Sequence, residues 1–127
     1  MLAESTNYTL GHSYESVFVV DKRDGSVRPA GDHYGDPSIG IVTQDERWFC
    51  TGGEGVQCFA LDGTLLTFFR EGQPSAGAPT IATAWFVRDL VLTSRNSLEV
   101  SFDLDELGTW TIDLSTACVT RQDPAAG

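Results

Sequence analysis

RWFCTGGEGVQCFALDG, residues 47–63, decides the fold of this chain. Its glycine-rich centre has two interpretations, a loop that wraps a phosphate or a turn between two strands. A phosphate loop needs a helix directly after it, because the helix N-terminus holds the anion, and a Walker loop also needs a Gly-Lys-Ser/Thr ending. Here the residues after the glycines alternate with the two-residue period of a strand, Val56, Cys58 and Ala60 against Gln57, Phe59 and Leu61. The run therefore predicts a tight hairpin, in which glycine supplies positive φ angles.

The same strand-and-turn pattern continues along the chain. Residues 17–20 form a strand, followed by a turn at Asp24-Gly25 and a short return strand that ends at Pro29. Residues 39–69 hold four short strands. Residues 83–120 supply up to four more, with turns expected at Arg88-Asp89, at 95–96 and at 105–108. Residues 71–80 read as a Gly/Pro loop, and no segment predicts a helix of three turns. We expect one all-β domain, residues 1–127, made of antiparallel meanders of about ten short strands.

Two blocks of the sequence, residues 39–69 and 83–120, resemble each other. Each has an early tryptophan, Trp48 or Trp85, and a later turn that contains an aspartate. Four-stranded meanders of this kind resemble the blades of a β-propeller, and residues 45–63 look like the middle of one blade. Because a propeller ring typically needs four or more blades, the expected packing is propeller-like or sandwich-like.

The charge of the chain limits its partners. Eighteen acidic residues against eight basic ones give a net charge of −10. Such a chain repels nucleic acid and anionic lipid and attracts a cationic partner. The longest purely apolar run, residues 17–20, is too short to cross a bilayer, and no secretory signal is visible. We expect a cytoplasmic protein that binds neither nucleic acid nor membrane and carries no cofactor.

The three cysteines do not form a disulfide framework or a zinc motif. Cys50 and Cys58 flank the glycine turn and could face each other across the hairpin, so a bridge between them is geometrically possible. Buried free thiols are the favoured interpretation over such a bridge.

One polar stretch, AGDHYGDP at residues 30–37, could contain a metal-binding or catalytic site. Asp32, His33 and Asp36 are possible metal ligands, and His33 could act as a base. The stretch reads equally as a surface loop, since Gly, Asp and Pro form turns. The chain has only two histidines, so it cannot form a metal site made of several histidines. It also lacks the Gly-x-Ser-x-Gly motif that would hold a nucleophilic serine. An enzyme is therefore not the expected class.

The acidic residues near the C-terminus are more informative. No lysine or arginine occurs between Arg95 and Arg121. The alternation over 98–103 and 110–114 predicts a hairpin with an apolar face and an acidic face. One interpretation of the acidic face is a solvated sheet surface, which soluble β proteins need in any case. The other is a docking surface that a basic partner neutralises, because like charges this close destabilise a fold. The predicted partner-binding residues are Glu99, Asp103, Asp105, Glu106 and Asp113, with Glu54 at the tip of the glycine hairpin as a weaker candidate.

Residues 35–63, GDPSIGIVTQDERWFCTGGEGVQCFALDG, resemble stretches of small β-rich immunity proteins of bacterial contact-dependent and polymorphic toxin systems. This resemblance implies a protein that forms a one-to-one complex with a cognate toxin domain, typically a nuclease with a cationic cleft, and blocks it. Three alternatives stay open. They are a propeller-like scaffold that binds a peptide or small ligand at the ends of its meanders, a small hydrolase that uses His33 and Asp36, and a subunit of a self-assembling ring.

Overall fold

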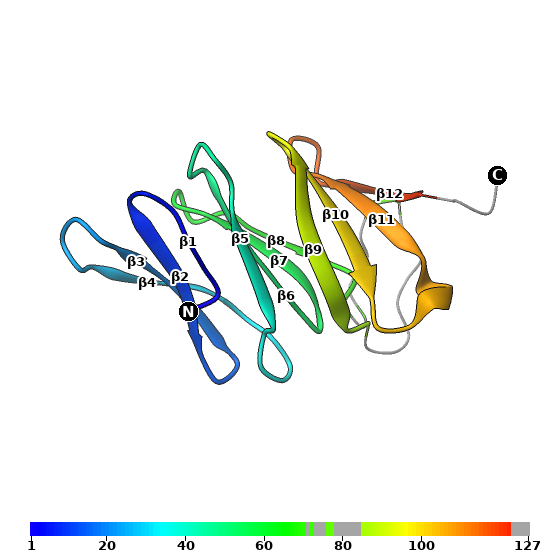
Figure 1. The fold of residues 1–127 in the computed structure, drawn as a ribbon, viewed down its shortest axis with the longest axis horizontal. Helices are drawn as coiled ribbons and strands as arrows, with labels where there is room; N and C mark the ends of the chain where they lie inside the picture. Colours follow the sequence, from blue (N-terminus) through cyan, green and yellow to red (C-terminus); the bar gives the residue numbers. More distant parts are fainter. Residues whose placement is uncertain (71, 73–75, 78–84, 123–127) are drawn as a thin grey trace.

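The computed structural model describes residues 1–70, 72, 76–77 and 85–122, and it consists of three four-stranded antiparallel sheets (Figure 1). The first sheet contains β1 (Ala3–Glu4), β2 (Tyr8–Ser13), β3 (Ser16–Asp21) and β4 (Val27–Asp32). The second contains β5 (Ile39–Val42), β6 (Trp48–Gly53), β7 (Gly55–Ala60) and β8 (Leu65–Phe68). The third contains β9 (Val87–Ser94), β10 (Ser97–Phe102), β11 (Thr109–Asp113) and β12 (Cys118–Gln122), with a short 3-10 turn, η1 (Asp105–Leu107), between β10 and β11. The all-β prediction is confirmed, with twelve strands among the described residues.

The sheets stack face to face along the long axis of the molecule, and the second sheet lies in the middle (Figure 1). Every residue of β6 and β7 is buried, because both faces of this sheet are covered. Trp48 and Cys50 pack toward the third sheet, whereas Phe49 and Phe59 pack toward the first. The arrangement is sandwich-like, and the sheets are open rather than closed into a ring.

The third sheet follows the predicted alternation. Leu98 pairs with Ile112 and Val100 with Trp110, and all four side chains are buried. Phe102 continues this face into an aromatic cluster with Phe69, Trp85 and Trp110, whose ring centroids lie 5.1–6.3 Å apart. Aromatic pairs at such distances add to the free energy of burial, so this end of the sheet is firmly packed.

The glycine run is the predicted hairpin. Gly53 pairs with Gly55 across the β6–β7 turn, and Gly55 has a φ of 74°. A Cβ at Gly55 would lie 2.7 Å from the carbonyl oxygen of Phe68, so both the backbone conformation and the space require glycine. Cys50 and Cys58 face each other directly in this register and are buried free thiols, as predicted.

Three expectations differ from the structure. The Arg88-Asp89 turn is wrong, because both residues lie inside β9, where a register shift opposite Ser101–Phe102 accommodates the extra residue. The return strand does not end at Pro29 but continues to Asp32, because β4 is an edge strand, where proline is tolerated. The strand Tyr8–Ser13 was not predicted from the sequence. Most of the predicted loop 71–80 lies outside the described residues.

Candidate functional site

One end of the molecule, which we call the turn end, gathers several of the connections between strands. The β2–β3, β4–β5, β6–β7 and β10–β11 connections all lie there, at the lower edge of Figure 1. Backbone hydrogen bonds join them in one line across the three sheets, so side chains from distant segments share a fixed platform. These bonds, each 2.9 Å long, run from His33 N to Glu15 O, Ser38 N to Gly52 O, Gly55 N to Trp85 O, and Asp103 N to Phe86 O.

The two ends differ in charge. Among the described residues the turn end carries eight carboxylates and three arginines, and the opposite end carries seven carboxylates and five basic side chains. Most of the excess negative charge of the described residues therefore lies at the turn end. The turn-end groups are Glu15, Asp32, Asp36, Glu54, Asp89, Asp103, Asp105, Glu106, Arg70, Arg88 and Arg121. The opposite-end groups are Glu4, Asp21, Asp24, Asp45, Glu46, Asp62, Asp113, Lys22, Arg23, Arg28, Arg47 and Arg95.

Carboxylates at the opposite end mostly hold turns together. The Asp62 carboxylate accepts a hydrogen bond from the backbone N–H of Thr64 at 2.9 Å, and the hydrogen bonds from Thr64 lower the pKa of Asp62. Asp113, one of the predicted partner-binding residues, accepts hydrogen bonds from the N–H and the hydroxyl of Ser115, which lower its pKa. Asp113 therefore stabilises the β11–β12 turn, at the end of the sheet remote from the other candidates.

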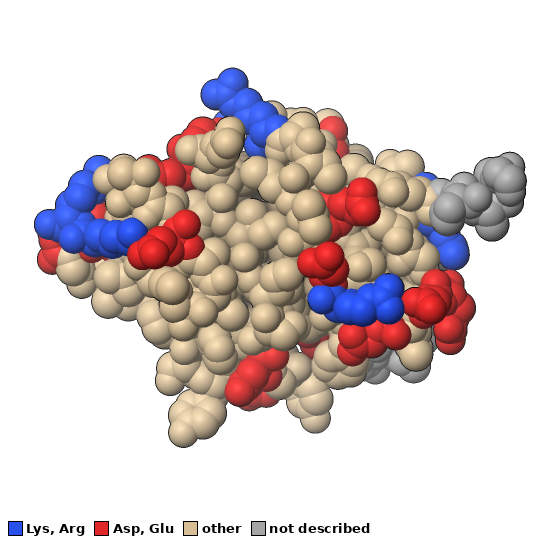
Figure 2. Space-filling view, viewed as in Figure 1, with Lys and Arg blue, Asp and Glu red and all other residues tan. Residues whose placement is uncertain are grey.

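Three predicted residues do come together. Asp103, Asp105 and Glu106 are exposed in the β10–β11 connection, and Asp105 pairs with Arg88 at 3.1 Å. Within the described chain the Asp103 and Glu106 carboxylates have no ion-pair partner. In Figure 2, acidic side chains gather around a basic one over the ends of β9 and β10 and over η1. This cluster keeps a net negative charge after its internal pairing.

The other two predicted residues lie elsewhere. Glu99 is half-buried in the middle of β10, on the outer face of the third sheet, where it accepts a hydrogen bond from Gln122 at 3.3 Å. Glu54 is at the hairpin tip, as predicted, but only 6% of it is exposed, because the tip pairs with Phe86. Its carboxylate lies 3.5 Å from Nε of Arg70. Glu54 is therefore a buried charge within the fold.

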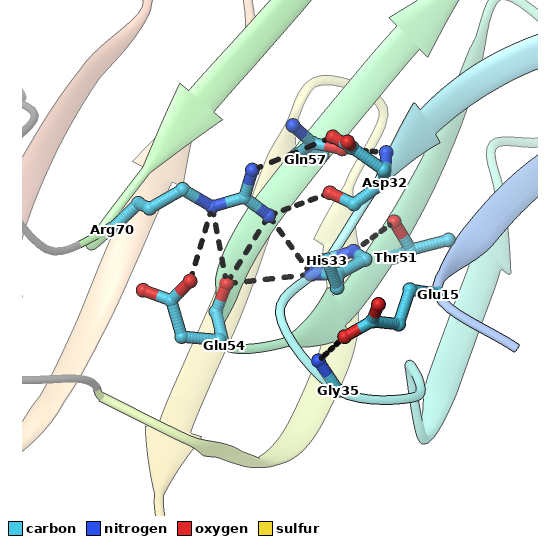
Figure 3. Close-up of polar contacts among 8 residues, drawn as sticks. All are labelled: Glu15, Asp32, His33, Gly35, Thr51, Glu54, Gln57 and Arg70. Carbon is cyan, nitrogen blue, oxygen red and sulfur yellow. Dashed lines mark hydrogen bonds and ion pairs between the residues drawn. The ribbon is translucent and has the colours of Figure 1, made fainter.

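The buried His33 and the largely buried side chain of Arg70 form a polar cluster at the turn end (Figure 3). Arg70 donates a 2.7 Å hydrogen bond to the carbonyl of Asp32 and contacts the carbonyl of Glu54. His33, 4% exposed, places Nε2 2.8 Å from the hydroxyl of Thr51 and Nδ1 3.2 Å from Arg70. Burial, together with the Arg70 charge, lowers the pKa of His33 to about 4. The imidazole is therefore neutral at pH 7.

The polar residues of the stretch 30–37 do not share one environment in the fold. His33 points into the fold, whereas Asp32 and Asp36 are exposed. No set of three or more His, Cys, Asp or Glu side chains placed to hold a metal ion occurs in the described part of the chain. Within that part, no helix has the length and apolar character needed to cross a bilayer.

Exposed apolar side chains at the turn end were not predicted. Tyr14 and Tyr34 are 82% and 77% exposed, and Phe86 and Leu104 are about half exposed. Each lies in or beside a connection that also carries carboxylates. The sequence does contain a sign of the exposed tyrosines. They lie beside glycine and acidic turn residues, where no strand could bury them.

Comparison of this chain with protein families, curated proteins and solved structures gives no match.

Proposed function

We propose that this protein is an inhibitor of the immunity type, which binds a basic protein toxin domain through the turn end. One observation carries the proposal. The turn end combines most of the unneutralised carboxylates with exposed aromatic side chains, whereas the carboxylates of the opposite end mostly cap turns. This combination supports a surface suited to a cationic protein.

The proposed mechanism follows from the charge and the apolar groups together. Carboxylates such as Asp103 and Glu106 would occupy sites on a nuclease that otherwise hold phosphates. Long-range attraction between the two surfaces would speed their encounter. Exposed pairs each contribute little affinity, so Tyr14 and Phe86 would supply most of it by entering pockets of the partner.

The rigid platform supports inhibition rather than loose association. Backbone hydrogen bonds such as Asp103 N to Phe86 O fix the β10–β11 connection against the middle sheet. The backbone of such a platform loses little conformational freedom when a partner binds, which favours a tight one-to-one complex.

The test compares two variants with the same change in charge. The turn-end triple, Asp103→Asn, Asp105→Asn and Glu106→Gln, removes three negative charges. The control triple, Thr6→Lys, Gln44→Lys and Ser94→Lys, adds three positive charges at exposed positions of the opposite end. Each protein serves as bait for a basic partner from lysate of its source organism, and is then co-expressed with that partner to measure growth.

We expect the unmodified protein and the control triple to form a one-to-one complex and to protect growth. The turn-end triple should bind on the order of tenfold more slowly, since surface charges act mainly on association rate. Equal binding and protection by both triples would contradict the acidic-surface proposal, and a partner that does not impair growth would contradict the inhibitor role.

A further inference from the structure

A hollow opens in the turn end between the first and second sheets. It has a volume of about 360 Å³ and is lined by Glu15, Asp32, His33, Tyr34, Glu54 and Arg70. The β2–β3 turn, the end of β4 with the loop after it, the β6–β7 tip and the segment after β8 each contribute to its wall. Side chains from four separate segments therefore converge on one space (Figure 3).

The wall of this hollow is fixed by contacts beneath it. Gln57, which is buried, accepts a 2.8 Å hydrogen bond from the backbone N–H of Asp32, and Glu15 accepts one from the N–H of Gly35. A Cβ at Gly31 would lie 2.2 Å from the Gln57 oxygen. The backbone over residues 31–35 and the Glu15 carboxylate are thus held in place before any ligand arrives, which lowers the entropic cost of binding.

The charge of the hollow selects against anions. Arg70 lies 3.5 Å from the Glu54 carboxylate and is bound to backbone carbonyls, so its charge is largely balanced within the wall. Asp32 is 3.8 Å from the same guanidinium and its side chain is 77% exposed. With His33 neutral, the carboxylates of Glu15, Asp32 and Glu54 outnumber the one arginine. The hollow therefore has a net negative charge at pH 7.

The rim of the hollow provides an aromatic face. Tyr34 lines the hollow and is nevertheless 77% exposed. A cation placed over a tyrosine ring is attracted by the negative charge of the ring face, and the attraction adds to that of nearby carboxylates. The size, charge and aromatic rim of the hollow all fit the head of a lysine or arginine side chain.

We propose that this hollow is an anchor subsite for a basic side chain, an alkylammonium or guanidinium group, that projects from the partner protein. The inference rests on the proposed function and adds the place where a single residue of the partner would bind. The carboxylates of Glu15 and Asp32 receive the cation, and Tyr34 covers it. The β10–β11 cluster acts separately, by attracting the partner at long range.

The test needs no partner. The protein, labelled with ¹⁵N, is titrated with N-acetyl-L-arginine amide and N-acetyl-L-lysine amide, and backbone shifts are followed by NMR. N-acetyl-L-citrulline amide, a neutral analogue of the arginine probe, and inorganic phosphate are the matched controls. Variants Asp32→Asn and Tyr34→Ala alter the hollow, while Asp36→Asn removes an exposed carboxylate from the same loop that does not line it.

We expect a cationic probe to shift residues 15, 32 and 34 and to bind at least tenfold more tightly than the citrulline probe. Asp32→Asn and Tyr34→Ala should each weaken binding by about fivefold, and Asp36→Asn should leave it nearly unchanged. Equal binding of the charged and neutral probes, shifts outside the hollow, or preference for phosphate would overturn the proposal. Because no partner is present, such a result would leave the separate test with the two triples intact.

Discussion

Between pH 7.5 and 5, acid should weaken this fold mainly through one residue, His33. Its side chain is 4% exposed, and its pKa is lowered from 6.5 to about 4 by burial and by the charge of Arg70. As the pH falls below 6.5, His33 becomes protonated in the unfolded chain, whereas in the folded chain it stays neutral until the pH approaches 4. The stability that depends on neutral His33 is therefore fully present above pH 6.5 and is lost as the pH falls toward 4.

The size of the effect follows from the two pKa values. A difference of one pKa unit corresponds to about 1.4 kcal/mol, so lowering the pH from 7.5 to 5 should remove about 2 kcal/mol of the free energy of unfolding. The carboxylates whose pKa values are lowered, such as Asp62 and Asp113, lose their contribution only as the pH falls through and below their usual range near 4. The interval between pH 7.5 and 5 therefore reports mainly on His33.

The assay is urea unfolding followed by tryptophan fluorescence at pH 7.5, 6.5, 5.5 and 5.0. In His33→Gln the free energy of unfolding should change much less over this interval, whatever its absolute value, because the titrating group is gone. His12→Gln changes the chain's other histidine, which is half-buried, and should keep the slope of the unmodified protein. A slope that is the same in His33→Gln and in the unmodified protein would refute the assignment.

Three further predictions concern the same fold, and each is measured by urea unfolding at pH 7.5. Arg70→Met should cost about 3 kcal/mol, because it removes the cation from the buried Glu54 carboxylate, and adding Glu54→Gln should recover more than half of the loss; no recovery would show that the ion pair is not the cause. Gly55→Ala should cost clearly more than Gly25→Ala, since both have φ near 75° but only Gly55 lies against the carbonyl of Phe68; equal losses would contradict the steric argument. Leu98→Ala, which empties a fully buried position between β9 and β11, should cost about 2–5 kcal/mol, and a loss under 1 kcal/mol would contradict the packing described.

Local patterns in the sequence were sufficient for most of the strands. The glycine hairpin and the alternation of Leu98, Val100 and Phe102 were predictable, because turn residues and a two-residue period act over a few positions. The strand Tyr8–Ser13 was missed because Gly11, His12 and Ser13 dilute its apolar face. Arg88-Asp89 was read as a turn because a bulge brings two adjacent polar side chains to the surface.

The candidate site was only partly predictable, since it depends on how three sheets stack. The grouping of Asp103, Asp105 and Glu106 follows from their adjacency in the chain. Their position at the same end as Tyr14 and Tyr34 follows from strand order and sheet packing, which no local pattern reveals. The same is true of Glu54, whose burial depends on its pairing with Phe86, in the segment that leads into β9.

Charge distribution cannot by itself tell a solvated surface from a binding surface. Asp113 illustrates this, because it was grouped with the β10–β11 acids on the basis of its strand face, yet its carboxylate holds a turn at the other end. Separating carboxylates that satisfy backbone N–H groups from those that do not required the three-dimensional contacts. This distinction between the two kinds of carboxylate is the reason for placing the proposed function at the turn end.

The association rate of the protein with its captured basic partner, measured by stopped-flow fluorescence at increasing salt, tests the central claim most directly. The screening length of the solution falls from about 10 Å at 0.1 M salt to about 3 Å at 1 M, so a rate that depends on attraction between exposed charges must fall as well. We predict a steep decline for the unmodified protein and the Thr6/Gln44/Ser94 control triple, and a slower, flatter rate for the Asp103/Asp105/Glu106 triple. A rate that is indifferent to salt, or that declines equally in all three proteins, would contradict the account.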